Sequence, residues 1–274
     1  MSPQAQEERI KTTDGVELFV RRNGVENPKG GVIIVHGLCE HGGRYDHVVS
    51  RLNDWGWSVY RFDLRGHGRS GGERGFVSDF QRYPEDTDLI VQKARKEIGD
   101  RPLYLLGHSM GGFIAAAYGI LYPDRLQGII HSGAAVIVLP MVADLGDFDY
   151  KAVAMNPIPN ELAAQVSRDP QVVRAYQEDP LVLKEFTTQL MGEVFLRGAK
   201  WLMEHMKDYR YPCLILHGGG DQIVTAEASR YFHEHISSPD KTLKIYDGLF
   251  HEILNEPEKE RVLEDIRLWL EGRK

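Results

Sequence analysis

The sequence predicts one α/β domain with a mostly parallel central sheet and a helical segment inserted into it. Short apolar runs alternate with stretches whose apolar residues recur at helical spacing, which is typical of βαβ units. A glycine follows each of the main apolar runs, as at corners where strands enter loops. With 274 residues, the chain is long enough for a single large domain that buries a substantial core.

Six apolar runs are the expected core strands, and amphipathic stretches between them are the expected helices. The strands are predicted at 31–37, 57–68, 102–107, 126–133, 212–221 and 241–248. The helices are predicted at 47–56, 80–99, 109–124, 225–236 and 256–272. The N-terminal segment differs, because Asp14-Gly15 lies between two alternating stretches. This pattern predicts an antiparallel hairpin at the sheet edge.

The alternation of strands and helices stops between about residue 135 and residue 211. This region holds five prolines and no clear strand pattern. We therefore expect helices inserted as a cap over one end of the sheet. The expected core is then 1–134 with 212–274, and the expected cap is 135–211.

Composition excludes several classes of function. The formal charge is −7 and the pI is about 5.9, which argues against nucleic acid, since such partners select clustered Lys and Arg. The two cysteines, Cys39 and Cys213, are too few for a disulfide framework and fit a reducing compartment. The chain has no secretory-signal pattern and no apolar run of the ~18 residues that span a bilayer. We expect a cytoplasmic protein, with transient membrane or micelle contact left open.

The run Gly107-His108-Ser109-Met110-Gly111 lies between an apolar strand and an alanine-rich helix. This context is typical of a nucleophile elbow, in which glycines let strand and helix approach while a strained serine points outward. Ser109 is therefore the expected nucleophile. The alternative is a serine that only caps the helix, and the glycines on both sides disfavour it.

A serine nucleophile needs a base and a carboxylate, which in this topology follow it in the order acid, then histidine. His251 follows the last predicted strand and is the expected base, and Asp221 follows the strand before it and is the expected acid. Asp247 is the rival acid, although Asp-Gly is also a plain turn signal. His217 at a strand end and His67 in a glycine-rich turn are expected to be structural.

The chemistry also needs N–H donors for the oxyanion of a tetrahedral intermediate. The backbone N–H of Met110 comes with the elbow, and that of Leu38, in the loop after the first core strand, is the expected second donor. Such donors contribute about 2.7–4 kcal/mol each to transition-state stabilisation. No metal or cofactor is expected, because the histidines fall on different elements.

Five segments resemble α/β-hydrolases of the monoacylglycerol lipase and lysophospholipase group: "HGLCEHGGRY", "FDLRGHGRSGG", "GHSMGG", "HGGGD" and "FHEI". The likeness is strong over 31–133 and 212–256 and weak in the insertion. It implies an α/β-hydrolase fold with a cap. It also implies hydrolysis of carboxylic esters through an acyl-enzyme, with monoacylglycerol or a related single-chain lipid as substrate.

The resemblance further implies that Glu40, Arg44 and His108 bind the glycerol end of the substrate. The alternative is that Glu40 and Arg44 pair with each other as loop structure. Cys39 stands where the family usually has a small residue such as glycine, and it would lie beside the oxyanion hole as a buried thiol. Apolar residues of 133–142 and 186–206 either line an acyl slot or dock the cap on the core.

Other functions remain open on the same scaffold. A lysophospholipase or a short-chain carboxylesterase would use the same triad, because fold does not fix substrate. A non-catalytic binding module of the same fold is a further alternative. It is disfavoured because the chain keeps the serine, the acid, the histidine and both elbow glycines.

Overall fold

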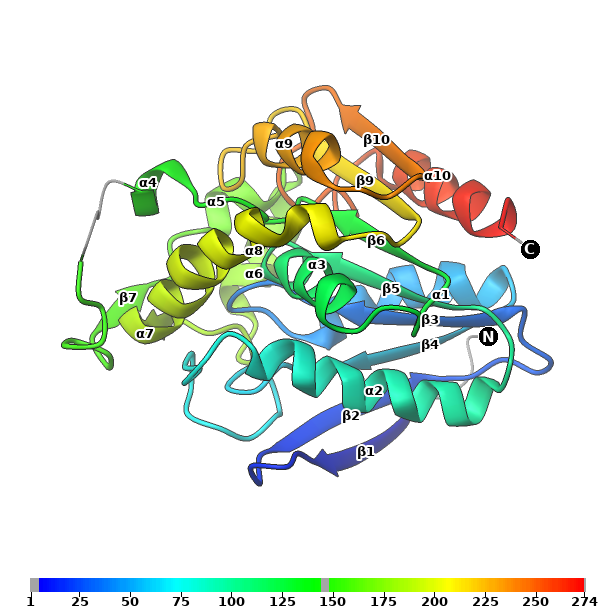
Figure 1. Cartoon of the computed structure of the whole chain (residues 1–274), viewed down its shortest axis with the longest axis horizontal. Helices are drawn as coiled ribbons and strands as arrows, with labels where there is room; N and C mark the ends of the chain where they lie inside the picture. Colours follow the sequence, from blue (N-terminus) through cyan, green and yellow to red (C-terminus); the bar gives the residue numbers. More distant parts are fainter. Residues whose placement is uncertain (1–4, 144–147, 274) are drawn as a thin grey trace.

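An eight-stranded sheet forms the centre of the computed structural model, which describes residues 5–143 and 148–273 (Figure 1). Its strands are β1 (Gln6–Lys11), β2 (Glu17–Asn23), β3 (Gly30–Val35), β4 (Trp57–Phe62), β5 (Leu103–His108), β6 (Gly128–Ser132), β9 (Cys213–Gly218) and β10 (Lys241–Tyr246). Their order across the sheet is β1-β2-β4-β3-β5-β6-β9-β10. The pairings from β4 to β10 are all parallel, and β1 and β2 are antiparallel.

The predicted core strands and the predicted hairpin are confirmed. Each core strand begins within two residues of its expected start. The hairpin closes through a hydrogen bond from the Gly15 N–H to the Thr12 carbonyl, with Gly15 at a φ of 92°. Glycine adopts that conformation without strain. The prediction for 57–68 was too long, because β4 ends at Phe62 and a loop follows.

Helices cover both faces of the sheet. They are α1 (Asp46–Asp54), α2 (Arg82–Ile98), α3 (Met110–Leu121), α9 (Glu227–His235) and α10 (Lys259–Glu271), with a short η1 (Gly42–Tyr45) before α1. In β3, Ile33 and Val35 pack in the apolar cluster that includes α2, α3 and α9. Val32 and Ile34 pack in the cluster that includes α1 and α10. Successive strand residues point to opposite faces, so the continuous apolar run of β3 follows from burial on both sides.

The insertion between β6 and β9 is a mixture of short helices and two short strands. It comprises α4 (Pro140–Ala143), β7 (Pro157–Pro159), α5 (Ala163–Val166), α6 (Pro170–Glu178), β8 (Glu185–Thr187), α7 (Thr188–Met191), the π-helical η2 (Gly192–Gly198), α8 (Ala199–His205) and η3 (Met206–Asp208). The expectation of helices alone was wrong, because β7 and β8 pair antiparallel. Each has only three residues, too few for an alternating pattern to be recognised.

The insertion leaves the sheet directly after β6 and lies at the left of the sheet in Figure 1. Leu190, Val194 and Leu202 are fully buried in the same cluster as Phe113 of α3. A Cβ at Gly198 would approach the Phe113 ring within 2.6 Å, so η2 packs closely on α3. These apolar residues therefore dock the insertion on the core. Within the described ranges, no helix is long and apolar enough to cross a membrane.

Candidate active site

Ser109 lies at the corner between β5 and α3. Its φ of 55° and ψ of −117° are rarely adopted by residues other than glycine. The surrounding backbone holds this conformation. The Ser109 N–H donates to the Ser132 carbonyl at 2.9 Å, and the Ser109 carbonyl accepts from the N–H of Gly112 at 2.9 Å and of Ala135 at 3.1 Å. The end of β6 and the first residues of the insertion thus stabilise the strained serine.

Glycine is required on both sides of this serine. A Cβ at Gly107 would lie against the backbone of Gly111, and a Cβ at Gly111 would lie against the carbonyl of Val35. Any larger residue would therefore push β5, α3 and β3 apart. The local geometry is that of a nucleophile elbow.

Asp221 and His251 come from the loops after β9 and β10 and contact each other. The Nδ1–H of His251 donates to Oδ2 of Asp221 at 2.6 Å, and both residues are buried. The other carboxylate oxygen, Oδ1, accepts the backbone N–H groups of Ile223 at 2.9 Å and Val224 at 3.0 Å. Asp247 is exposed in the turn after β10. The structure therefore brings Asp221, and not the rival acid, to His251.

Asp221 has a second histidine neighbour whose proximity the sequence analysis missed. Nε2 of His217 lies 3.1 Å from Oδ2 of Asp221, and the Nε2–H also donates to the Val224 carbonyl at 2.7 Å. Nδ1 of the same ring lies 2.7 Å from the Ser229 hydroxyl. His217 is thus structural, as expected, and it also fixes the position of the acid. The short separation of four residues between His217 and Asp221 was the feature of the sequence that could have indicated this contact.

The charges in this group favour an ionised acid and a basic histidine. Burial raises the pKa of Asp221, but the charge of His251 and hydrogen bonds from His217 and His251 outweigh burial and hold that pKa well below its usual range. Burial lowers the pKa of His251, and the charge and hydrogen bond of Asp221 more than reverse this, so the pKa of His251 lies above its ordinary value. An ionised Asp221 stabilises the imidazolium that forms when His251 takes a proton.

His251 lies against the carboxyl ends of β5 and β6, near Ser109. A Cβ at Gly133, the residue after β6, would lie 3.3 Å from Nδ1 of His251. The ring centroids of His251 and His108 are 4.8 Å apart, and His108 directly precedes Ser109. His251 is therefore held against both strand ends that position Ser109.

The loop after β3 passes close to Ser109. A Cβ at Gly37 would lie 3.1 Å from the Cβ of Ser109, so the backbone that leads into Leu38 runs beside Ser109. Met110 is the first residue of α3, where N–H groups have no partner within the helix. The two expected oxyanion donors, Leu38 and Met110, thus belong to the segments that border Ser109.

Cys39 adopts a φ of 65°, in the left-handed region that favours glycine. A small residue such as glycine would adopt this conformation more easily than a cysteine does. The Cys39 carbonyl accepts the Leu183 N–H at 2.8 Å, which ties the loop to the insertion. Burial raises the pKa of the Cys39 thiol, so the thiol remains protonated and unreactive.

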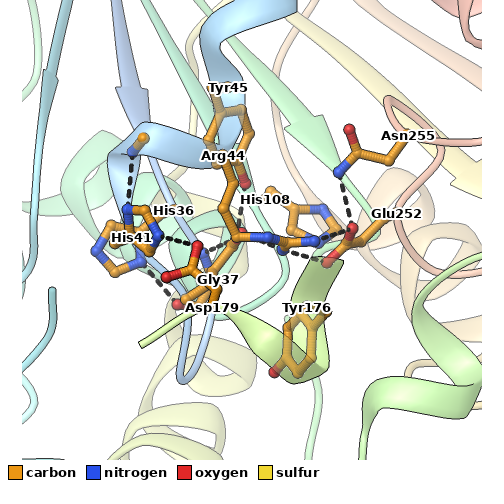
Figure 2. A network of polar contacts seen from close by, with 12 residues as sticks. His36, Gly37, His41, Arg44, Tyr45, His108, Tyr176, Asp179, Glu252 and Asn255 are labelled. Carbon is orange, nitrogen blue, oxygen red and sulfur yellow. Dashed lines mark hydrogen bonds and ion pairs between the residues drawn. The ribbon is translucent and has the colours of Figure 1, made fainter. Parts of the chain in front are cut away.

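Arg44 pairs with Glu40 and also with a second carboxylate, Glu252, and Figure 2 shows the Arg44–Glu252 pair. The Nη1–H groups of Arg44 donate to Glu40 at 2.7 Å and to Glu252 at 2.5 Å, and its Nη2–H donates to Glu252 at 2.8 Å. Glu40 also accepts the Gly37 N–H at 2.6 Å and the Tyr45 hydroxyl at 2.7 Å. The pairing that was the alternative to substrate binding is thus present. The sequence analysis missed Glu252, although it directly follows His251.

His108 is buried and neutral. Burial and the neighbouring charge of His251 lower its pKa to about 4. Its Nδ1 lies 3.0 Å from the Ser132 carbonyl, which only accepts, so Nδ1 carries the proton. Burial raises the pKa of Glu40, but Arg44 and the nearby histidines outweigh burial and bring it to about 2. A neutral His108 thus lies beside an ionised Glu40.

His67 has a structural position. It is fully buried, and its Nδ1 lies 3.0 Å from the Arg65 carbonyl. Burial lowers the pKa of His67 to about 3. The glycines on either side, Gly66 and Gly68, have φ values of 73° and 48°, which shape the tight turn.

Comparison with known proteins agrees with this geometry. The model of the family "Serine aminopeptidase, S33" matches residues 26–258. The monoacylglycerol lipase of Mycolicibacterium smegmatis is 37% identical, over 89% of this chain and 89% of that protein. The monoglyceride lipase of Mus musculus is 31% identical, over 96% of this chain and 90% of that protein.

A solved structure supports the same assignment. The crystal structure of Paleococcus ferrophilus monoacylglycerol lipase has a TM-score of 0.82 and 33% identity, and covers 94% of this chain and 100% of that one. The resemblance drawn from the five sequence segments is confirmed, as is the expected fold. The chain belongs to the α/β-hydrolases of the serine aminopeptidase S33 family, and within it the chain is a serine hydrolase similar to monoacylglycerol lipases.

Proposed function

We propose that this protein hydrolyses monoacylglycerol to a fatty acid and glycerol, with Ser109 as nucleophile, His251 as base and Asp221 as the acid that orients the base. The observation that carries the proposal is the 2.6 Å hydrogen bond between His251 and Asp221 beside a serine held at a φ of 55°. The monoacylglycerol lipases that match most of the chain support the substrate class.

The reaction proceeds through an acyl-enzyme. Ser109 Oγ attacks the ester carbonyl while Nε2 of His251 takes its proton, and Asp221 fixes the tautomer that leaves Nε2 unprotonated. The N–H groups of Leu38 and Met110 stabilise the oxyanion. His251 then protonates the departing glycerol oxygen. It next removes a proton from water, which attacks the acyl-enzyme, and passes that proton to Ser109 Oγ as the fatty acid leaves.

The two ends of the substrate occupy different sides of the serine. Glu40, Arg44 and His108 form the polar side, where the glycerol binds. The acyl chain lies along the first residues of the insertion, because the Ala135 N–H bonds the Ser109 carbonyl and the half-buried Ile137 and Val138 follow. One such path suits a lipid with a single chain.

Residues 135–211 act as the cap of a core formed by 1–134 and 212–274. Phe148 and Met155 of this cap are 41% and 55% exposed, which favours transient contact with a membrane or micelle. The acidic charge and cysteine usage support a cytoplasmic location, peripheral to the membrane.

Hydrolysis of a matched substrate panel tests the proposal. The panel contains 1-monoacylglycerols of graded chain length, lysophosphatidylcholine, p-nitrophenyl butyrate and an aminoacyl amide. We expect monoacylglycerol turnover, and we expect Ser109→Ala to lower kcat by roughly 10⁴- to 10⁶-fold. Cleavage of p-nitrophenyl butyrate alone would indicate a carboxylesterase, and faster cleavage of lysophosphatidylcholine would indicate a lysophospholipase. A folded protein that cleaves none of them would be a non-catalytic module.

A further inference from the structure

Three buried charged side chains lie together beside the base. Glu40 is 3% exposed, Glu252 is 4% exposed, and the Arg44 side chain is 9% exposed. Two carboxylates therefore share one guanidinium, and the trio carries one net negative charge (Figure 2). The neutral His108 adds no positive charge beside the serine.

The surrounding groups do not reverse this balance. Tyr45 and Asn255 contribute neutral donors, through a hydroxyl to Glu40 and an amide N–H to Glu252 at 2.7 Å each. The ring of Tyr176 covers the Arg44 guanidinium, with the cation 4.7 Å from the ring centroid. Nearby, Nε2 of His41 lies 2.9 Å from Oδ2 of Asp179. The positive charge of Arg44 is thus enclosed by carboxylates and an aromatic face.

This negative charge lies close to both His251 and Ser109, where the proposed reaction releases the alcohol. Glu252 directly follows His251, whose Nε2 delivers the proton to the leaving oxygen. Oε1 of Glu40 and Cβ of Ser109 each lie 3.1 Å from the position that a Gly37 Cβ would occupy. In a buried site the interaction between charges at such separations is much stronger than in water.

We propose that Glu252 is a specificity-determining residue that restricts the leaving group to uncharged alcohols and excludes esters whose head group carries a phosphate. Its carboxylate holds the Arg44 guanidinium in a two-point pair, so a phosphate would have to displace it to reach Arg44. Glu252 also leaves the polar side of the site net negative, which repels an incoming anion. The inference rests on the proposed hydrolysis at Ser109 and adds a limit on the head group.

Substrates that share one acyl chain and differ in the head group test this role. The set contains monoacylglycerol, a monoacyl ester of diglycerol, lysophosphatidylglycerol and lysophosphatidic acid. The diglycerol head group is uncharged but larger than glycerol, so this ester distinguishes an effect of head-group charge from an effect of head-group size. We expect wild type to cleave both uncharged esters and to discriminate against both anionic ones by about tenfold or more in kcat/KM.

Glu252→Gln removes the charge and keeps the side-chain volume. We expect it to raise the ratio of kcat/KM for lysophosphatidylglycerol to that for the diglycerol ester by about tenfold. Glu252→Asp should keep the wild-type ratio. Glu258→Gln is the matched control, because it removes an equal charge from the same loop at a side chain that is 49% exposed, and it should leave the ratio unchanged.

The outcomes separate this inference from the proposed function. A folded Glu252→Gln enzyme that cleaves monoacylglycerol with the wild-type ratio overturns the role of Glu252. If that variant does not fold, the wild-type series still decides, since equal kcat/KM for the anionic and the diglycerol esters overturns the exclusion of phosphate. A wild type that cleaves no lipid of the set overturns the proposed function and this inference with it.

Discussion

Two segments of the insertion are attached to the core by different forces. The segment 162–183, which contains α5 and α6, is joined to the loops around the serine by hydrogen bonds and ion pairs; we call it the polar segment. The segment 188–206, which contains α7, η2 and α8, is joined to α3 by apolar packing; we call it the apolar segment. The difference indicates that the polar segment positions the loops that hold His251 and Leu38, whereas the apolar segment stabilises the fold.

The polar segment contacts both loops that flank Ser109. The Glu252 N–H donates to the Val166 carbonyl at 2.7 Å, which fixes the loop of the base. The Leu183 N–H donates to the Cys39 carbonyl at 2.8 Å, which fixes the loop of the expected oxyanion donor. One short stretch of the insertion is thus bonded to the neighbours of both His251 and Leu38.

Among the described residues, the apolar segment makes no hydrogen bond to the loop of Leu38 or to the loop of His251. Its buried charge, Glu193, accepts the Tyr150 hydroxyl at 2.8 Å, an Arg197 N–H at 2.6 Å and the Phe80 N–H at 3.2 Å. These partners lie in the insertion and before α2. The segment therefore contributes burial, and a change there should alter stability before it alters chemistry.

The largest expected effect is on stability, in the apolar segment. Leu202→Ala empties a fully buried position in the main core cluster. We expect the free energy of unfolding to fall by about 2–5 kcal/mol, measured by urea denaturation. The kcat/KM of the folded variant should stay near that of wild type. A large loss of kcat with unchanged stability would show that the two segments do not differ as described.

The next effect is on catalysis, at a contact between the polar segment and the loop that holds His251. Glu256 is fully buried and accepts the Ser167 hydroxyl at 2.6 Å, the Arg168 N–H at 2.6 Å and the Phe250 N–H at 3.2 Å. Since Phe250 precedes His251, Glu256→Gln should loosen the loop of the base and lower kcat by about tenfold. Steady-state kinetics on monoacylglycerol at temperatures below the unfolding transition measure this.

The control for that variant is Glu258→Gln. Glu258 also binds the Arg168 guanidinium but is 49% exposed, and exposed ion pairs contribute little. We expect its kcat within about twofold of wild type. Equal losses for the two variants would mean that the buried bonds of Glu256 do not position the base.

The smallest effect is on pH dependence. His251 must be neutral to accept the proton of the nucleophile, so kcat/KM falls as the pH drops through the pKa of His251, which lies above its ordinary value. The negative charges of Asp221, Glu252 and Glu40 raise that pKa against burial. Glu252→Gln removes one of them, so the acid limb of the kcat/KM profile should move to lower pH. A limb that moves to higher pH, or stays in place, would contradict this account.

Much of the fold, and the contact between Asp221 and His251, could be predicted from local patterns and from the order of the strands. A strand that is buried on both faces has a continuous run of apolar residues in the sequence. The strained corner at Ser109 requires a glycine on each side, at Gly107 and Gly111. Asp221 was preferred over Asp247 from the order of strands, although Asp247 is nearer to His251 in sequence. A parallel sheet brings the carboxyl ends of neighbouring strands to one edge. The order of the strands therefore identified the carboxylate that contacts His251, whereas distance along the sequence would have favoured Asp247.

The partners of the polar residues could not be predicted in the same way. Arg44 and Glu252 are 208 positions apart, and no periodicity links two loops that meet only after folding. Glu40 was expected to pair with Arg44 or to bind substrate, and the second carboxylate that binds Arg44, that of Glu252, was not predicted. The strands β7 and β8 were missed for a related reason, since three residues each give no period.

The central claim is that Ser109 is a nucleophile activated by His251. Its most direct test is reaction with a fluorophosphonate, followed by intact-mass measurement and mapping of the modified peptide. We expect one adduct, on Ser109, with no adduct in Ser109→Ala and a much slower reaction in His251→Ala. A folded wild type that forms no adduct, or forms it on another serine, would contradict the account.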